Sequence, residues 1–204
     1  MSSGICPRAN EERIIKFTPN LLSLVRDFAC NERSCGNHAH FSDYLNTHAL
    51  LEYCSGRNIT HLFCSVDEDE NPVLVKGFIT LRASSVLVGT ESGGYVGVPS
   101  VEISELAVDK RYERQGIGSM LLKFAISFCE EVREYIGVRY LTVYADKMAV
   151  DFYKHVMEFD DVSGYEIPHD DWNSNCVPLI KQLRDIYSLE PCFYSEEDED
   201  DEYV

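Results

Sequence analysis

The sequence predicts one α/β domain, in which a mixed central sheet of about six or seven strands carries helices on both faces. The chain of 204 residues suits one hydrophobic core, and 45% of its residues are hydrophobic. Its apolar segments are either short runs typical of strands or longer stretches with helical spacing. A strand, a helix and a second strand follow one another between residues 101 and 145, and this order forms a crossover that places both strands in one sheet.

Two helices are predicted before the main sheet. A short strand covers Ile14–Phe17, and Asn20 is placed to cap a helix whose apolar face extends to Ala29. Ser42 is placed to cap a second helix. This helix stops near Gly56, because glycine readily takes the left-handed conformation that follows a helix end.

The later elements follow from spacing and turn residues. The polar turn DEDENP joins two strands into an antiparallel hairpin, and the glycine-rich segment 88–100 is predicted as a surface loop. Apolar residues recur every three or four positions over Ile117–Ile136, which predicts a long helix with one buried face. The predicted strands are residues 61–66, 74–83, 101–108, 140–145 and 177–183, and the predicted helices are residues 117–136 and 148–159.

The acidic C-terminal segment is predicted to lie outside the folded domain. Residues 1–190 form the domain and residues 191–204 form a disordered tail, because Glu196–Glu202 consists of seven acidic residues. The first twenty residues lack the apolar stretch of a secretory signal, and no run of 18 apolar residues exists. We therefore expect a cytoplasmic protein without a membrane segment.

Eight cysteines are expected to be free thiols rather than disulfides. Several lie inside apolar segments such as HLFCSV and AISFCEEV, where a buried thiol packs as a small apolar group. Cys129 is a poor candidate for a nucleophile, since burial on the apolar face of its helix raises a thiol pKa.

The net charge of −17 bears on the partners of the protein. A strongly acidic surface repels phosphate backbones and gains nothing from counterion release, so nucleic acid is not expected as the partner. The same charge mildly favours a cationic amine substrate.

A turn with two glycines carries the clearest chemical signal. Gly116 and Gly118 lie between a predicted strand and the start of the long helix. Glycines let the backbone approach a ligand closely, and the first N–H groups of a helix attract anions. The segment contains neither GxxxxGKS/T nor a complete GxGxxG motif. The junction therefore predicts a pyrophosphate site of another kind.

The stretch resembles the coenzyme A motif of the GNAT superfamily of N-acetyltransferases, Arg/Gln-x-x-Gly-x-Gly/Ala. Both glycines match, whereas Glu113 departs from the first position. The resemblance extends over residues 61–160, through VEISELAVDKRYERQGIGSMLL and LTVYADKMAVDFYKHVMEF. The segments FSDYLNTHALLEY and GFITL are also similar, more weakly, to the toxin-related bacterial subgroup of this superfamily.

The resemblance implies a GNAT fold with acetyl-CoA as co-substrate, held by a splayed pair of strands, and no metal. It implies that the backbone of Leu106, Ala107 and Val108 binds the pantetheine arm. The turn implied to hold the pyrophosphate consists of Arg114, Gln115, Gly116, Ile117, Gly118 and Ser119.

The resemblance also implies catalytic groups for direct transfer of the acetyl group to a primary amine of a small molecule, peptide or protein. Tyr153, in the pattern Ala-x-x-Phe-Tyr, is the expected acid for the leaving thiolate. Glu102 is the expected base and Glu105 the alternative, with ordered water also open. Strand alternation places the two glutamates on opposite faces unless a bulge resets the register.

Other functions remain open on the sequence. A non-catalytic acyl-CoA sensor and a toxin-like aminoacyl-tRNA acetyltransferase are the alternatives to an amine acetyltransferase. Cys30, Cys35, His38 and His40 supply zinc-type ligands within eleven residues, but the spacing C-x4-C-x2-H-x-H does not match structural zinc sites. Dimers are frequent in the superfamily, so a homodimer is a further option.

Overall fold

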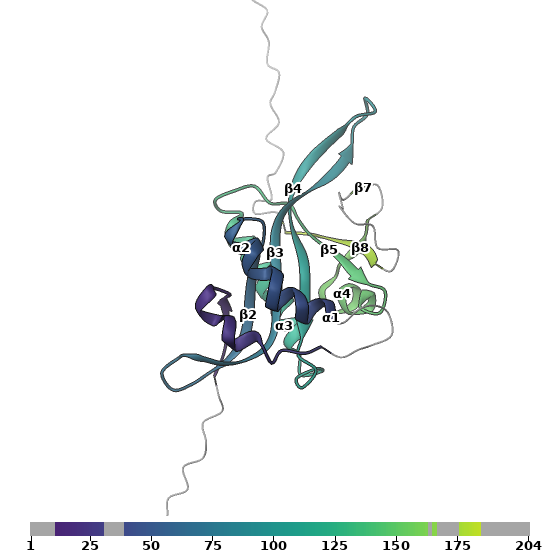
Figure 1. The fold of residues 1–204 in the computed structure, drawn as a ribbon. Helices are drawn as coiled ribbons and strands as arrows, with labels where there is room; N and C mark the ends of the chain where they lie inside the picture. Colours follow the sequence, from purple (N-terminus) through teal and green to yellow (C-terminus); the bar gives the residue numbers. More distant parts are fainter. Residues whose placement is uncertain (1–10, 31–38, 163–164, 167–175, 185–204) are drawn as a thin grey trace, which may run out of the picture.

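Eight strands form one mixed sheet in the computed structural model, which describes residues 11–30, 39–162, 165–166 and 176–184 (Figure 1). The strand order is β1-β2-β3-β4-β5-β8-β6, with β7 paired to β3, and β4 and β5 are the parallel pair. The predicted mixed sheet is confirmed, and two strands of two residues each raise the strand number above six or seven. The strands are β1 (Glu12–Lys16), β2 (Ile59–Val66), β3 (Pro72–Gly89), β4 (Tyr95–Val108), β5 (Tyr140–Asp146), β6 (Asp160–Asp161), β7 (Tyr165–Glu166) and β8 (Cys176–Gln182).

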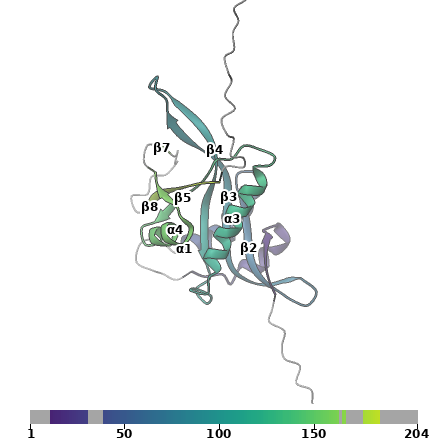
Figure 2. The same ribbon diagram turned by 180° about the vertical axis from the view of Figure 1, so that it is seen from behind.

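Helices cover both faces of this sheet (Figures 1 and 2). One face carries η1 (Pro19–Val25), α1 (Ala39–Asp43), η2 (Tyr44–His48) and α2 (Ala49–Cys54). The other face packs against α3 (Ile117–Val132) and α4 (Val150–Met157). Because side chains alternate along a strand, β3 serves both cores. Phe78 lies fully buried in the first and its neighbour Ile79 in the second.

The second predicted helix is confirmed but begins earlier than expected. Helix α1 already contains Ser42, whose carbonyl accepts a 2.9 Å hydrogen bond from the Asn46 amide, so the predicted cap at Ser42 is wrong. The helix continues through η2, a wider π-type turn, into α2. Gly56 follows its end with φ +71°, the left-handed conformation expected there.

The first predicted helix is a short 3-10 segment. Pro19 occupies the first helical position, where its fixed φ and missing N–H are tolerated. The Asn20 side chain accepts a hydrogen bond from the Thr18 hydroxyl and does not cap the segment, so that prediction is wrong. Helix α3 likewise ends at Val132, four residues before the predicted end.

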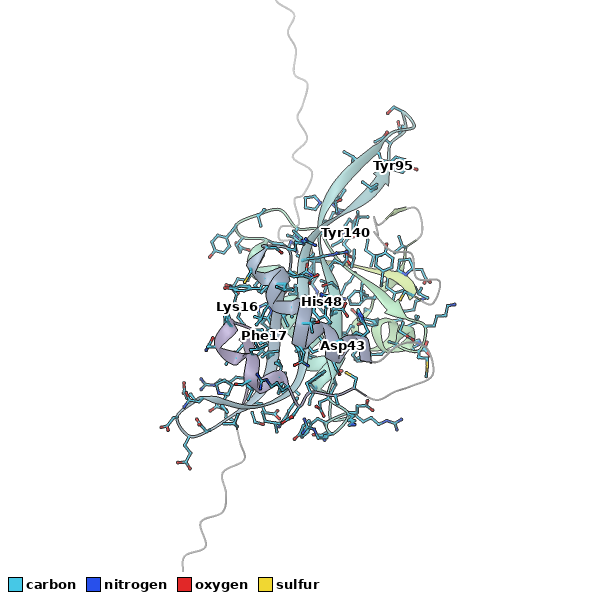
Figure 3. All side chains as sticks on the ribbon, in the orientation of Figure 1. Lys16, Phe17, Asp43, His48, Tyr95 and Tyr140 are labelled. Atoms are coloured by element: carbon cyan, nitrogen blue, oxygen red, sulfur yellow. The ribbon has the colours of Figure 1, made fainter. Side chains whose placement is uncertain are left out.

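The glycine-rich segment predicted as a loop instead extends a long hairpin. Pairing between β3 and β4 continues to Gly89 and Tyr95, which leaves only residues 90–94 as the turn. Thr90 closes this turn by accepting a 3.1 Å hydrogen bond from the Gly94 N–H. The hairpin end projects from the sheet as an arm, with Tyr95 towards its tip (Figures 1 and 3). Alternating valines on both strands favour this extended form over a loop.

His61 on β2 is a buried histidine packed against α3. Its ring centroid lies 4.8 Å from that of Phe124 and 5.8 Å from that of Phe128, and its Nδ1 atom is buried without a hydrogen-bond partner. Burial, with the nearby Lys16 charge, lowers the pKa of His61 from 6.5 to about 4. The folded protein therefore holds this ring neutral at a pH where the unfolded chain is protonated.

The free energy of unfolding should consequently decrease as the pH falls from 6.5 to about 4. The unfolded state binds a proton in this window that the folded state does not, and the full effect is about 3 kcal/mol. The variant His61→Phe keeps the ring packing and should lose this part of the pH dependence. Urea unfolding of both proteins at about pH 7 and pH 4.5 measures it, and equal losses in the two proteins would refute the assignment.

Several expectations concern residues only partly described. The boundary at residue 190 and the tail 191–204 lie outside the described residues, as do Cys35 and His38.

Among the described cysteines, Cys30, Cys54, Cys64, Cys129 and Cys176 are free thiols. Burial raises the pKa of Cys129 to about 12, as expected for an unreactive thiol. No helix within the described ranges has the length and apolar character needed to cross a membrane.

Candidate functional site

The parallel strands β4 and β5 separate at one end. Their pairing runs from Ser100–Tyr140 to Ile103–Val143, whereas β4 continues to Val108 and β5 to Asp146. Beyond Ile103, β4 keeps its pairing with β3 on the other side. The predicted splayed pair is therefore present, and one edge of β4 is open towards the gap in the described part of the sheet.

Leu106, Ala107 and Val108 lie on this open stretch of β4. The side chains of Leu106 and Val108 pack towards α3, while Ala107 packs into the core under η1 and α2. Their backbone groups on the open edge can hydrogen-bond an extended ligand, in the way that a further strand would pair. The pantetheine role of these three residues stays a prediction, which the open edge of β4 allows.

The glycine turn lies at the N-terminus of α3. Gly116 takes φ +82° as the residue before the helix, and Arg114 takes φ +60°, so the turn is left-handed at two positions. The N–H groups of Ile117, Gly118 and Ser119 precede the first helical hydrogen bond, in which Met120 donates to the Gly116 carbonyl at 3.0 Å. With the helix dipole, these N–H groups can attract a phosphate group.

Gly118 is required for a second reason, the close approach of α4. A Cβ atom at Gly118 would lie 3.2 Å from Cζ of Phe152, tighter than an ordinary contact. Phe152 is partly buried against the main core, and its ring lies 5.3 Å from that of Tyr153. The glycine therefore allows α4 to pack closely against the start of α3.

An ion pair that no sequence motif marks holds the segment just before the glycine turn. The Asp109 side chain is fully buried and accepts hydrogen bonds from Arg111 at 2.8 Å to each carboxylate oxygen. It also accepts the Ala29 N–H at 3.1 Å. Arg111 in turn donates to the Asp27 carbonyl at 3.2 Å. These contacts fasten the segment between β4 and α3 to the chain following η1.

Tyr153 is buried in the main core, with only 5% of its surface exposed. Its ring meets those of Phe152 and Phe159 edge to face, at 5.3 and 5.5 Å. Burial, followed by the negative charge of Glu105, raises the pKa of Tyr153 well above its usual value of 10. The phenol is therefore protonated at neutral pH.

A bulge in β4 brings the two glutamates to one face. Thr80 of β3 pairs with Glu105 and Leu81 pairs with Ile103, so Ser104 is an extra residue on β4. Glu102 pairs with Arg82, two residues from Thr80 on β3, and both glutamates therefore point to the same side. The expected separation onto opposite faces does not occur, because the bulge resets the register.

The glutamates nevertheless have different partners. Glu102 is 3% exposed, and its oxygens accept hydrogen bonds from Arg82 at 2.8 Å and Ser84 at 3.3 Å. Glu105 is more accessible, with 14% of its side chain exposed, and contacts Nε2 of His40 at 3.0 Å. Glu102 is thus engaged in an ion pair with Arg82, whereas Glu105 contacts the titratable ring of His40 on α1.

These features suit acetyl-CoA better than a metal ion. The open edge of β4 matches an extended amide chain, and the start of α3 matches a pyrophosphate. In the ranges that the structure describes, no group of three or more histidine, cysteine or acidic side chains could hold a metal ion. His40, weighed above as a zinc ligand, is paired with Glu105.

Comparisons with known proteins agree with this geometry. The model of the acetyltransferase (GNAT) family matches residues 31–159. A tRNA-acetylating toxin of Mycobacterium tuberculosis (strain ATCC 25618 / H37Rv) is 32% identical over 120 residues, which cover 55% of this chain and 68% of the toxin.

Solved structures of toxins share the fold. The AtaT toxin complexed with acetyl-methionyl-tRNAfMet superposes with a TM-score of 0.62 at 21% identity, covering 84% of this chain and 95% of the toxin. A Tyr-to-Phe mutant of AtaT bound to acetyl-CoA and to the C-terminus of the antitoxin AtaR gives a TM-score of 0.61 at 20% identity, over 85% and 94% of the two chains. The family resemblance and the likeness to its toxin-related members are both confirmed.

Proposed function

Because the chain belongs to the acetyltransferase (GNAT) family, we propose that it moves an acetyl group from acetyl-CoA directly to a primary amine. The chain is an acetyl-CoA-dependent acyltransferase of this family. One observation supports the direct transfer: β4 and β5 separate beyond Ile103, and the core packed against these strands contains both Tyr153 of α4 and Ile117 at the start of α3.

Each part of this region has one task in the proposed reaction. Bound acetyl-CoA supplies the activated thioester. The backbone of Leu106–Val108 would hold its pantetheine arm, and the turn Arg114–Ser119 its pyrophosphate. Tyr153 would give its proton to the departing thiolate.

The carboxylates differ in what they offer the amine. Glu102, the expected base, is only 3% exposed, and Arg82 and Ser84 already occupy its oxygens. We assign it to holding Arg82 and the strand register. Glu105 is the carboxylate that remains accessible from the side of α1. Its negative charge also attracts a cationic amine, as the net charge of −17 does over longer range.

Aminoacyl-tRNA is the second candidate for the acceptor. The 32% identical relative is a tRNA-acetylating toxin, and AtaT has been captured with acetyl-methionyl-tRNAfMet. The α-amino group of an amino-acid ester is a primary amine, so the same chemistry would serve. The net charge of −17 opposes binding of the tRNA backbone, and therefore favours a small-molecule, peptide or protein amine as the first candidate.

The variant Gly116→Glu tests the pyrophosphate turn. Its carboxylate would enter the anion site and repel the pyrophosphate, so acetyl-CoA should bind about 30-fold more weakly. Isothermal titration calorimetry measures this. Gly93→Glu is the matched control, because Gly93 has φ +81°, has no atom within 4 Å of an added Cβ, and lies in the arm. Equal losses in both variants would contradict the assigned site.

Release of free thiol from acetyl-CoA tests catalysis and the acceptor together. Wild-type protein is offered small amines, peptides with free amino groups and aminoacyl-tRNA in parallel. Release with the first two alone supports the first candidate, and release with aminoacyl-tRNA alone supports the second. Binding of acetyl-CoA without release from any acceptor would instead support the acyl-CoA sensor.

A further inference from the structure

A histidine from α1 and a glutamate from β4 meet on the face of the sheet opposite α3. Nε2 of His40 lies 3.0 Å from a carboxylate oxygen of Glu105. The His40 side chain is 57% exposed, while Glu105 is 14% exposed. The His40 ring thus connects the mostly covered Glu105 carboxylate with the surface. The two residues are 65 positions apart in the chain.

The hydrogen bond determines which ring nitrogen can take a proton. A carboxylate accepts only, so Nε2 carries the hydrogen and Nδ1 keeps the lone pair. The bond to Glu105 also raises the pKa of His40 above 6.5; burial opposes this, and the charges of Glu105 and Asp43 add to it. A base whose pKa lies near the working pH is the most effective at removing a proton.

The surroundings of the pair are compatible with this role. The rings of Phe41 and Tyr44 lie 5.5 and 6.4 Å from that of His40. On the β4 side, burial and the negative charge of Glu105 raise the pKa values of Tyr153 and of the Cys176 thiol. Both of these groups are therefore neutral, and neither competes as a base.

We propose that His40 is the general base for the acceptor amine and that Glu105 is its positioning residue. This inference rests on the proposed amine acetylation and goes beyond it by naming a base outside the GNAT motif. Glu105 keeps the His40 tautomer and stabilises the imidazolium that forms.

The proton and bond changes balance as follows. The ammonium group of the acceptor loses one proton to Nδ1 of His40, which passes it to water. The neutral amine then attacks the acetyl carbon, and the C–N bond forms. As the C–S bond breaks, Tyr153 donates its proton to the sulfur and regains one from the nitrogen. The products are the acetylated amine, free thiol and one proton released to solvent.

The pH dependence of kcat/KM tests the assignment. His40→Asn should lower kcat/KM about 100-fold at pH 7, and the fall in rate at acidic pH that reports His40 should disappear. The deficit should shrink as the pH rises past the pKa of the acceptor, because the amine is then already neutral. Glu105→Gln should move the acidic limb to lower pH, since the carboxylate no longer raises the histidine pKa.

Matched controls separate this role from a structural one. His155→Asn removes another histidine near a carboxylate, 3.8 Å from Asp151 on α4, and should leave the profile unchanged. Acetyl-CoA affinity and thermal unfolding should be unchanged in His40→Asn. If His40→Asn fails to fold, the shift of the acidic limb of the kcat/KM profile in Glu105→Gln still tests the assignment.

Two results would overturn the inference. If wild type releases thiol and the acidic limb persists unshifted in the variants, His40 is not the base while the amine acetyltransferase stands. If wild type releases no thiol with any amine, the proposed function fails and the inference with it.

Discussion

The variant Tyr153→Phe is expected to lower kcat by about 100- to 1,000-fold, the typical contribution of a positioned acid. The phenylalanine keeps the edge-to-face packing with Phe152 and Phe159 and removes only the hydroxyl. The leaving thiolate would then depart without a proton. Binding of acetyl-CoA should be unaffected, because the turn at Gly116 and the open edge of β4 are unchanged.

Single-turnover thiol release at saturating acetyl-CoA, with calorimetry in parallel, measures both quantities. Tyr140→Phe is the control, since Tyr140 is equally buried at 5% exposure but packs with Val86 and Ile180 in the small core beneath the arm. Its kcat should remain within about twofold of wild type. A kcat for Tyr153→Phe within the same range would assign Tyr153 a packing role alone.

Asp109→Ala is expected to lower the free energy of unfolding by about 3 kcal/mol. The carboxylate is fully buried, and its removal leaves the N–H groups of Ala29 and Arg111 without their acceptor. The segment before the pyrophosphate turn would also lose its attachment to the chain after η1. Acetyl-CoA should then bind more weakly even at temperatures where the variant stays folded.

Urea unfolding measures this loss, with Asp161→Ala as the control. Asp161 pairs with Lys154 at the surface, so its removal should cost less than about 0.5 kcal/mol. Burial alone would raise the pKa of Asp109, but hydrogen bonds from Arg111 and Ala29 outweigh it and lower the pKa. Its contribution is therefore present at neutral pH and lost as the pH falls below the usual aspartate range. A loss equal to that of Asp161→Ala would contradict this account.

Local sequence patterns predicted most of the fold. The spacing of apolar residues located the long helix, and the strand on each side of it followed from short β-branched runs. The arm was mistaken for a loop because glycines and serines are typical of turns. In the structure the valines between them pair across β3 and β4 down to Gly89 and Tyr95. Strand pairing depends on two segments together, so the composition of one segment cannot predict it.

In the candidate site, too, features set by neighbouring residues were predictable, and features set by contacts between distant residues were not. The turn Arg114–Ser119 and Tyr153 could be proposed from motifs, because both depend on a few neighbouring residues. The shared face of Glu102 and Glu105 could not, since it depends on one extra residue, Ser104, opposite β3.

The amino-acid sequence was enough to predict the fold class, the family and the turn that fits a pyrophosphate. These depend on local spacing and on backbone conformations that particular residues favour. Three contacts could be seen only in the folded chain: Glu102 pairs with Arg82, Glu105 meets His40, and Asp109 fastens the segment before the turn to Ala29. Each of these contacts joins residues 20 or more positions apart, and their energy depends on burial and distance, which exist only once the chain has folded.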